Sequence, residues 1–148
     1  MKKLYLVLFI LINTSNNSYS KNLILDNLNT PSKTTQNQKW SFITDEVMGG
    51  FSEGTFKIDK IQNQLCYRMT GNVTTKNNGG FIQIRAIIKP EIYINKFKGI
   101  YIKVFGNNKK YNLFLRTGLT LAPWQYYGFS FFSSDQWIII KAPFKEFK

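Results

Sequence analysis

The 148-residue sequence has no histidine and a single cysteine, Cys66. Without histidine there is no Ser–His or Cys–His nucleophile pair and no imidazole ligand for a metal ion. One cysteine cannot form a disulfide within the chain. Cys66 lies between Leu65 and Tyr67 in an alternating apolar run, so we predict a small structural side chain on a strand rather than a reactive thiol.

Acidic residues are also scarce, eight against 20 lysines and arginines. Glycoside hydrolysis needs two carboxylates that face each other across ~5–10 Å, whereas Asp45 and Glu46 are adjacent and point to opposite sides of an extended chain. No Asp-x-Asp cluster offers the oxygen ligands that calcium needs. We therefore predict a protein that is not an enzyme, with no catalytic residue, no metal site and no cofactor. An enzyme that uses Asp45 with an acid from a distant segment is an alternative.

The formal net charge is +12, and a basic chain is compatible with binding to nucleic acid or to an anionic surface. Only three of the basic residues are arginines, Arg68, Arg85 and Arg116. The lysines are scattered apart from Lys109-Lys110, and abundant lysine, asparagine, isoleucine and phenylalanine are typical of an AT-rich genome. We predict no nucleic-acid partner.

The N-terminal segment has the pattern of an export signal. Two lysines precede an apolar run of nine residues, Leu4 to Ile12, and the small residues Ser18 and Ser20 flank Tyr19 at a suitable cleavage position. The apolar run is too short for a membrane-spanning helix, which needs ~20 residues. We therefore predict a signal peptide over residues 1–20 and one domain over residues 21–148, exported to the periplasm or secreted, with no transmembrane segment in the mature chain.

Apolar and polar residues alternate in many short stretches that are separated by Gly and Asn turns, which predicts an all-β protein, a sandwich or a barrel. A turn at Gly106–Asn108 separates two of these stretches, so we expect them to form a hairpin. The expected strands are 23–25, 56–58, 65–69, 81–85, 100–104, 111–116, 127–131 and 137–140.

Two turn motifs, Asp45 to Gly54 and Asn77 to Phe81, each join polar residues to a Gly-Gly pair and then to an aromatic residue. Together with further segments in a fixed order, they resemble the complex I intermediate-associated protein 30 family between Ile24 and Phe147. These further segments are Trp40, Gly71-Asn72-Val73, Ile82 to Arg85, Gly99-Ile100, Tyr111 to Arg116, Trp137 and Pro143-Phe144. The chain departs from the family at Glu46, where a small residue is usual, and at Asn107-Asn108, where an acid is usual.

The resemblance implies a single jelly-roll type β-sandwich, similar to galactose-binding domains, that is not catalytic. It also implies a protein partner, so we expect an assembly or stability factor for a membrane or envelope complex. A carbohydrate-binding module of jelly-roll type is the alternative.

The candidate binding residues lie mostly in turns. Asp45 is expected either to accept backbone N–H bonds from its own turn, Met48 to Gly50, or to line a polar cleft with Asn77, Asn78 and Arg85. The structural turn residues are Gly49, Gly50, Gly79 and Gly80, which allow positive φ or close backbone approach.

The other candidates are either binding contacts or packing residues. Met48 is a partner contact or a core filler. Arg85 and Arg116 on apolar strands require a carboxylate or a ligand. Trp124 and Tyr126 either stack on a sugar ring or pack at the edge of the sandwich.

The leader can be checked directly. Mass spectrometry of the exported protein should find Lys21 or a near neighbour at the N-terminus, because the charged start, the apolar run and Ser18-Tyr19-Ser20 fit signal-peptidase cleavage. An exported protein that still carries Met1 would contradict the prediction.

Overall fold

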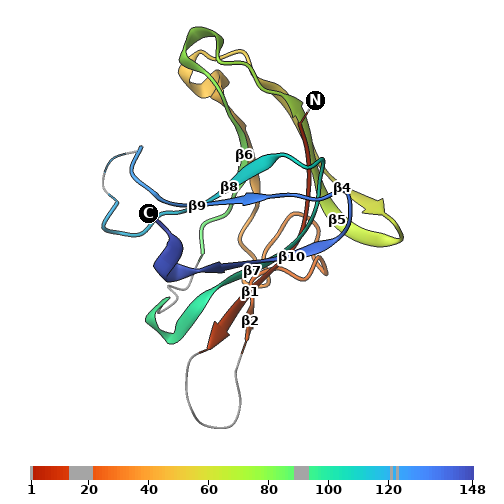
Figure 1. Cartoon of the computed structure of the whole chain (residues 1–148), viewed down its shortest axis with the longest axis vertical. Coiled ribbons are helices and arrows are strands. Elements are labelled where there is room, and N and C mark those ends of the chain that lie inside the picture. The colour runs from red at the N-terminus through yellow and green to blue at the C-terminus, as the bar shows by residue number, and fades with distance from the viewer. Residues whose placement is uncertain (1, 14–21, 89–93, 121, 123) are drawn as a thin grey trace.

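The computed structural model describes residues 2–13, 22–88, 94–120, 122 and 124–148. Within these ranges the chain forms strands and short 3₁₀ helices and no α-helix, which confirms the all-β prediction (Figure 1). The strands are β1 (Lys2–Asn13), β2 (Leu23–Ile24), β3 (Ser41–Thr44), β4 (Glu53–Ile61), β5 (Gln64–Asn72), β6 (Ile82–Arg85), β7 (Phe97–Phe105), β8 (Lys110–Leu115), β9 (Tyr127–Phe132) and β10 (Ile138–Pro143). The 3₁₀ helices are η1 (Asp45–Met48), η2 (Lys76–Asn78), η3 (Ile94–Lys96) and η4 (Phe144–Glu146).

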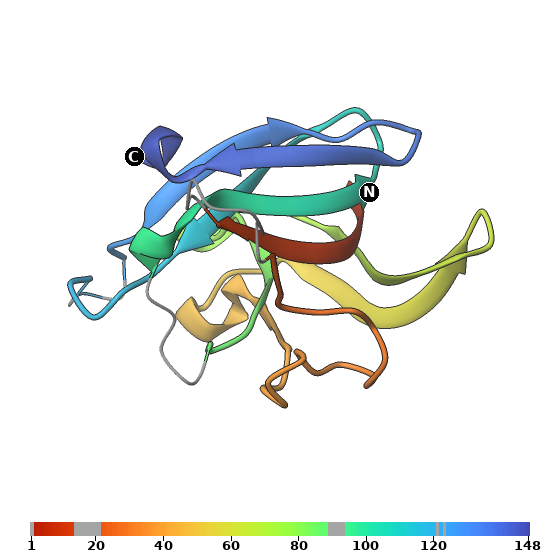
Figure 2. The same ribbon diagram turned by 90° about the horizontal axis from the view of Figure 1, so that it is seen from below.

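The largest sheet has the order β10-β7-β1-β5-β4, with β2 paired to the end of β1. All the pairings are antiparallel. Two further two-stranded ribbons are β3–β6 and β8–β9 (Figure 2). β4 and β5 form a nine-pair hairpin through Gln62 and Asn63, whose φ values of 49° and 64° define a two-residue type I′ turn.

The predicted leader contains β1, the middle strand of the large sheet. β1 pairs on one side with β5, through Lys2 and Gly71, and on the other with β7, through Tyr5 and Phe105. Residues 14–21, which include the expected cleavage position, lie outside the described residues. Cleavage after Ser20 would take β1 out of the centre of the sheet, and this cleavage stays a prediction.

The hydrophobic core lies between the large sheet and the two ribbons. Alternate residues of β7 (Ile100, Ile102 and Val104) are all buried, as the period of two along a strand requires. They belong to one cluster with Tyr111 of β8 and Phe131 of β9. The alternating apolar stretches of the sequence are therefore the inner faces of strands.

A buried carboxylate, Asp26, ties the segment after β2 to this core. It accepts hydrogen bonds from Leu28 N (2.7 Å), Trp40 Nε1 (2.6 Å) and the Tyr67 hydroxyl (3.0 Å). These donors offset the cost of burying the charge. Burial, and then the charge of Asp26, raises the pKa of the Tyr67 phenol.

The expected hairpin between residues 100–104 and 111–116 is wrong. β7 pairs with β1 and β10, whereas β8 pairs with β9. The Gly106–Asn108 turn instead carries the chain from the sheet to the ribbon, and Gly106 N donates to Ser134 O. The alternation of apolar and polar residues shows only that each strand has a buried face. Here β7 and β8 bury these faces from different layers, so they are not paired with each other.

Cys66 is fully buried on β5, in agreement with its predicted structural role. Its sulfur lies 3.6 Å from the Asp59 carbonyl oxygen, to which it donates. Burial raises the pKa of the thiol to about 11, so the reactive thiolate is scarce at neutral pH.

Candidate functional site

The two turn motifs meet at one end of the molecule, at the top of Figure 1. β3 leads into η1, and η2 precedes β6. Because β3 and β6 are antiparallel, with Thr44 opposite Ile82, the end of one strand lies beside the start of the other. We call this end of the molecule the tip.

Asp45 joins the segments of the tip. Its side chain is fully buried, and its carboxylate accepts hydrogen bonds from the Ser52 N–H and hydroxyl and from the N–H groups of Gly80 and Phe81. The Ser52 oxygen in turn accepts from Thr74 N (3.1 Å). One carboxylate thus connects η1, the chain entering β4 and the chain entering β6.

The donors differ from those expected for a local turn. In the turn itself, Gly50 N donates to the main-chain oxygen of Asp45 and Gly49 N to that of Glu46. The carboxylate is thereby left for Ser52 and for the second motif.

The environment of Asp45 favours its ionised form. Burial alone would raise the pKa of the carboxyl group, but the Ser52 hydroxyl and the three backbone N–H donors outweigh it. The net effect lowers the pKa from 3.8 to about 2. Asp45 is therefore a stable anion at neutral pH.

Both glycine pairs are needed around this anion. A Cβ atom at Gly50 or at Gly79 would lie 2.4 Å from atoms of the Asp45 carboxyl group. The other member of each pair has positive φ, 81° at Gly49 and 140° at Gly80. One glycine of each pair makes room for the carboxylate, and the other permits the backbone conformation.

Two further glycines let the layers approach near the tip. Gly54 of β4 and Gly71 of β5 are opposite each other in the hairpin. A Cβ at Gly54 would lie 3.0 Å from the ring of Phe42 on β3, and one at Gly71 would lie 2.7 Å from Ile82 on β6. A Cβ at Gly54 would also lie 3.3 Å from Ile82. Both β3 and β6 therefore pack against β4, and the Ile82 side chain also reaches Gly71 of β5.

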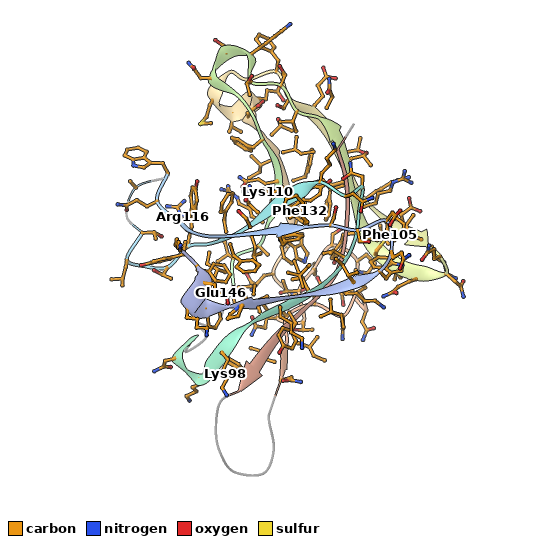
Figure 3. All side chains as sticks on the ribbon, in the orientation of Figure 1. Lys98, Phe105, Lys110, Arg116, Phe132 and Glu146 are labelled. Atoms are coloured by element: carbon orange, nitrogen blue, oxygen red, sulfur yellow. The ribbon has the colours of Figure 1, made fainter. Side chains whose placement is uncertain are left out.

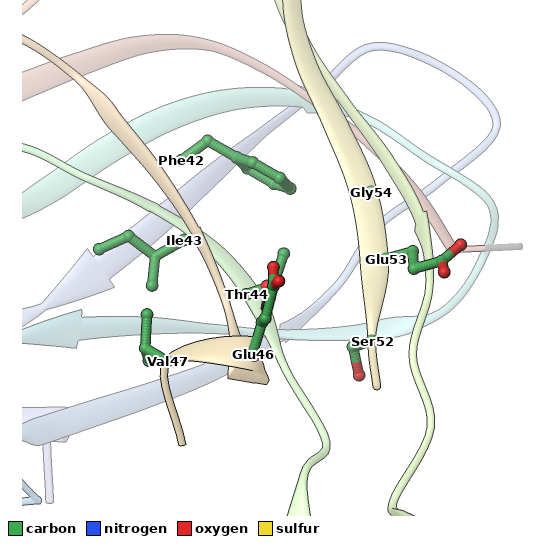
Figure 4. A pocket seen from close by; sticks show the side chains of 8 residues that line it. All are labelled: Phe42, Ile43, Thr44, Glu46, Val47, Ser52, Glu53 and Gly54. Carbon is green, nitrogen blue, oxygen red and sulfur yellow. Dashed lines mark hydrogen bonds between the residues drawn. The ribbon is translucent and has the colours of Figure 1, made fainter. Parts of the chain in front are cut away.

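An open groove of about 510 Å³ runs along this side of the tip, between β3 and the start of β4 (Figure 4). Val47 and Ile43 lie on one side of it, and Ser52 and Glu53 on the other. Its lining residues are Phe42, Ile43, Thr44, Glu46, Val47, Ser52, Glu53 and Gly54. We call it the tip groove.

The tip groove is acidic and apolar. Glu46 and Glu53 are exposed, and the ion pairs found among the described residues, Lys57–Asp59 and Arg68–Asp59, involve neither of them. Three apolar side chains in or next to the groove are largely exposed: Val47 (72%), Met48 (63%) and Phe51 (64%). An acidic surface with exposed apolar side chains is suited to a partner that carries both basic and apolar groups.

The structure brings some of the predicted site residues together and separates others. Asn77 donates from Nδ2 to Gly49 O (2.6 Å) and so links the two motifs. Asn78 is exposed at the tip with φ 58°. Arg85, in contrast, is at the far end of β6, four residues beyond Phe81 and thus about 13 Å along the strand. The tip does not include Arg85.

Arg116, Trp124 and Tyr126 belong to a second region, between β8 and β9. Arg116 donates to the carbonyl oxygens of Thr120 (3.3 Å) and Ala122 (3.0 Å) and so braces this connection. Tyr126 packs on Phe114, with ring centroids 4.1 Å apart, and Trp124 is 77% exposed. Figure 3 shows Arg116 well away from the tip.

Sequence reasoning missed the tip groove as a site. Five of its lining residues, from Glu46 to Gly54, lie in the first turn motif, but the three on β3 had no signal in the sequence. In the described part of the chain, no three His, Cys, Asp or Glu side chains are grouped as a metal site would require. Nor does any helix in the described residues have the length and apolar character to cross a membrane.

The tip and the strands around it define an all-β domain organised by two glycine-rich turns about a buried carboxylate. The sequence model of the family Complex I intermediate-associated protein 30 (CIA30) matches residues 28–148, so the chain belongs to this family. Searches of curated proteins and of solved structures give no match.

The glycines at Asp45 give a stability prediction. Gly50→Ala and Gly79→Ala should each destabilise the fold by more than the ~1 kcal/mol typical of point mutations, because the new methyl group would occupy the space of the carboxylate. Gly118→Ala is the matched control, since a Cβ there meets nothing within 4 Å. Urea denaturation measures all three. Equal midpoints for Gly50→Ala and Gly118→Ala would contradict the packing.

The lowered pKa of Asp45 gives a pH dependence. Its ionised form stabilises the fold above about pH 4, and this contribution is lost as the pH falls towards 2. Asp45→Asn should therefore lower stability at neutral pH and flatten the loss of stability between about pH 4 and 2. Some dependence of stability on pH remains in this variant, because the Arg68 guanidinium lowers the pKa of Asp59 to about 2 as well. Thermal melting across this range would show identical slopes for both proteins if Asp45 made no contribution.

Proposed function

We propose that this chain is an exported, non-catalytic protein-binding factor that assists the assembly or stability of a membrane or envelope complex. Membership of the complex I intermediate-associated protein 30 family supports a protein partner. The jelly-roll arrangement of galactose-binding domains is part of the proposal. So is export to the periplasm or beyond the cell, which the charged and apolar N-terminal residues support.

The observation that carries the proposal is the tip. Its exposed apolar side chains, Val47, Met48 and Phe51, follow or flank a turn that the Asp45 hydrogen bonds hold in place. A turn whose backbone is already held in place binds a partner at a smaller entropic cost than a mobile one. Because the Asp45 carboxylate already accepts hydrogen bonds within the chain, we assign it the role of holding the conformation of the turn.

A carbohydrate-binding module is the second candidate, and one observation favours it. Phe114, Tyr126 and Trp124 present exposed aromatic rings near the β8–β9 ribbon. Beside them on the same exposed face, the Ser130 hydroxyl lies 2.7 Å from Asn112 Oδ1, to which it donates. Aromatic and hydroxyl or amide groups together could bind a sugar ring.

The two candidates place binding in different regions, and a capture experiment separates them. The full chain, immobilised and exposed to envelope extract, should retain one stable protein partner. Met48→Glu at the tip should abolish this retention, whereas Trp124→Ala should not. Both side chains are largely exposed, so neither substitution should disturb the core. Recovery of glycan alone, lost in Trp124→Ala, would favour the carbohydrate-binding module.

A further inference from the structure

Two unpaired strand edges lie on the same side of the tip. Among the described strands, β3 pairs only with β6 and β4 only with β5. β3 packs against β4, and the open groove lies between β3 and the start of β4, beside these two edges. The tip groove follows these edges.

The lining of the groove supports this placement. Successive side chains of a strand point to opposite faces, so a groove that touches one face meets every second residue. The tip groove instead meets three consecutive residues on β3, Phe42 to Thr44, and three at the start of β4, Ser52 to Gly54. It therefore runs along the strand edges, where the backbone is accessible.

The register identifies the backbone groups at these edges. Asp45 N donates to Phe81 O, so in this antiparallel pair Asp45 and Ile43 turn their backbone groups towards β6. Phe42 and Thr44 then turn theirs to the unpaired edge. The same alternation, counted from the two-residue turn after Ile61, directs the backbone groups of Gly54 to the unpaired edge of β4.

The side chains select the chemistry of the occupant. Glu46 and Glu53 place two exposed carboxylates at the groove of a chain with a net charge of +12. At physiological salt, interactions between exposed charges are screened beyond ~8 Å, so these carboxylates outweigh distant lysines for a group in contact with them. Phe42, Ile43 and Val47 offer apolar surface in the same groove.

We propose that the tip groove binds an extended segment of the partner protein by strand addition. The backbone of this segment pairs with the outer edge of β3 at Phe42 and Thr44. Its lysine or arginine side chains meet Glu46 and Glu53, and its apolar side chains cover Phe42 and Val47. Main-chain hydrogen bonds supply affinity and the alternating side chains supply specificity, as in other cases of strand addition. The inference rests on the proposed function, because it assumes a protein partner.

The test uses the full chain and three acetylated octapeptides, alternating Lys-Val, Arg-Val and Lys-Ile, with a Glu-Val octapeptide as the charge control. At least one basic peptide should bind with a Kd below 1 mM by NMR titration and should protect the Phe42 and Thr44 amides from hydrogen exchange. The Glu-Val peptide should not bind. Methylation of the peptide nitrogens that face β3 should abolish binding, whereas methylation of the alternate nitrogens should preserve it.

Charge variants test the role of the acids. Glu46→Lys and Glu53→Lys should each raise the Kd of the basic peptide by roughly fivefold or more. Glu146→Lys, an exposed acid of η4 outside the groove, is the matched control and should leave binding unchanged. Strand addition would be overturned if none of the three basic peptides bound the chain. It would also be overturned if binding did not depend on which peptide nitrogens are methylated, or if the chain associated with itself through β3.

The outcome separates this inference from the proposed function. Capture of the protein partner by wild type and by Glu46→Lys/Glu53→Lys alike would overturn strand addition and leave the binding function intact. Loss of capture in this double variant, but not in Glu146→Lys, would support strand addition by the partner itself. A glycan in place of a protein in the capture experiment would overturn both.

Discussion

The hydrogen bonds to the Asp45 carboxylate are the interaction on which the functional end of this protein depends. Four donors from Ser52, Gly80 and Phe81 converge on one buried anion. They tie together chain segments up to 36 residues apart in sequence. The glycine pairs, the direction of η1 and the entry into β4 all follow from the space and geometry that this anion needs. With the anion in place, the tip presents apolar and acidic side chains on an ordered turn.

An unpaired strand edge is normally a liability, since it can pair with any other exposed strand. Further along β4, Lys57, Asp59 and Lys60 place charges near the edge, and such charges discourage pairing between chains. At β9, the terminal Lys148 exchanges two backbone hydrogen bonds with Gly128. The edge of β3 beside the groove carries Phe42 and Ile43 instead. The contrast within one molecule suits a site where pairing is functional.

Local chemistry explains what could be predicted from the sequence. Alternation located most strands, and the Gly-Gly turns were correct because φ preferences act within a few residues. Partners across layers could not be predicted: alternation shows that Tyr111 faces a core but does not show which strand lies beside it. The donors to Asp45 come from distant segments, and the tip groove is a property of strand edges, which no single stretch of sequence reveals.

The position of β1 has a consequence for folding kinetics. The first strand of the chain pairs with residues that follow it by about 70 and 100 positions, as in Lys2 with Gly71 and Tyr5 with Phe105. Closing loops of this length precedes any gain from the contacts, so folds rich in such pairings form slowly. The large sheet cannot be completed until most of the chain has been synthesised. A nascent chain of this kind therefore stays unfolded for longer than a helical protein of equal length, and its unpaired strands are exposed for that time.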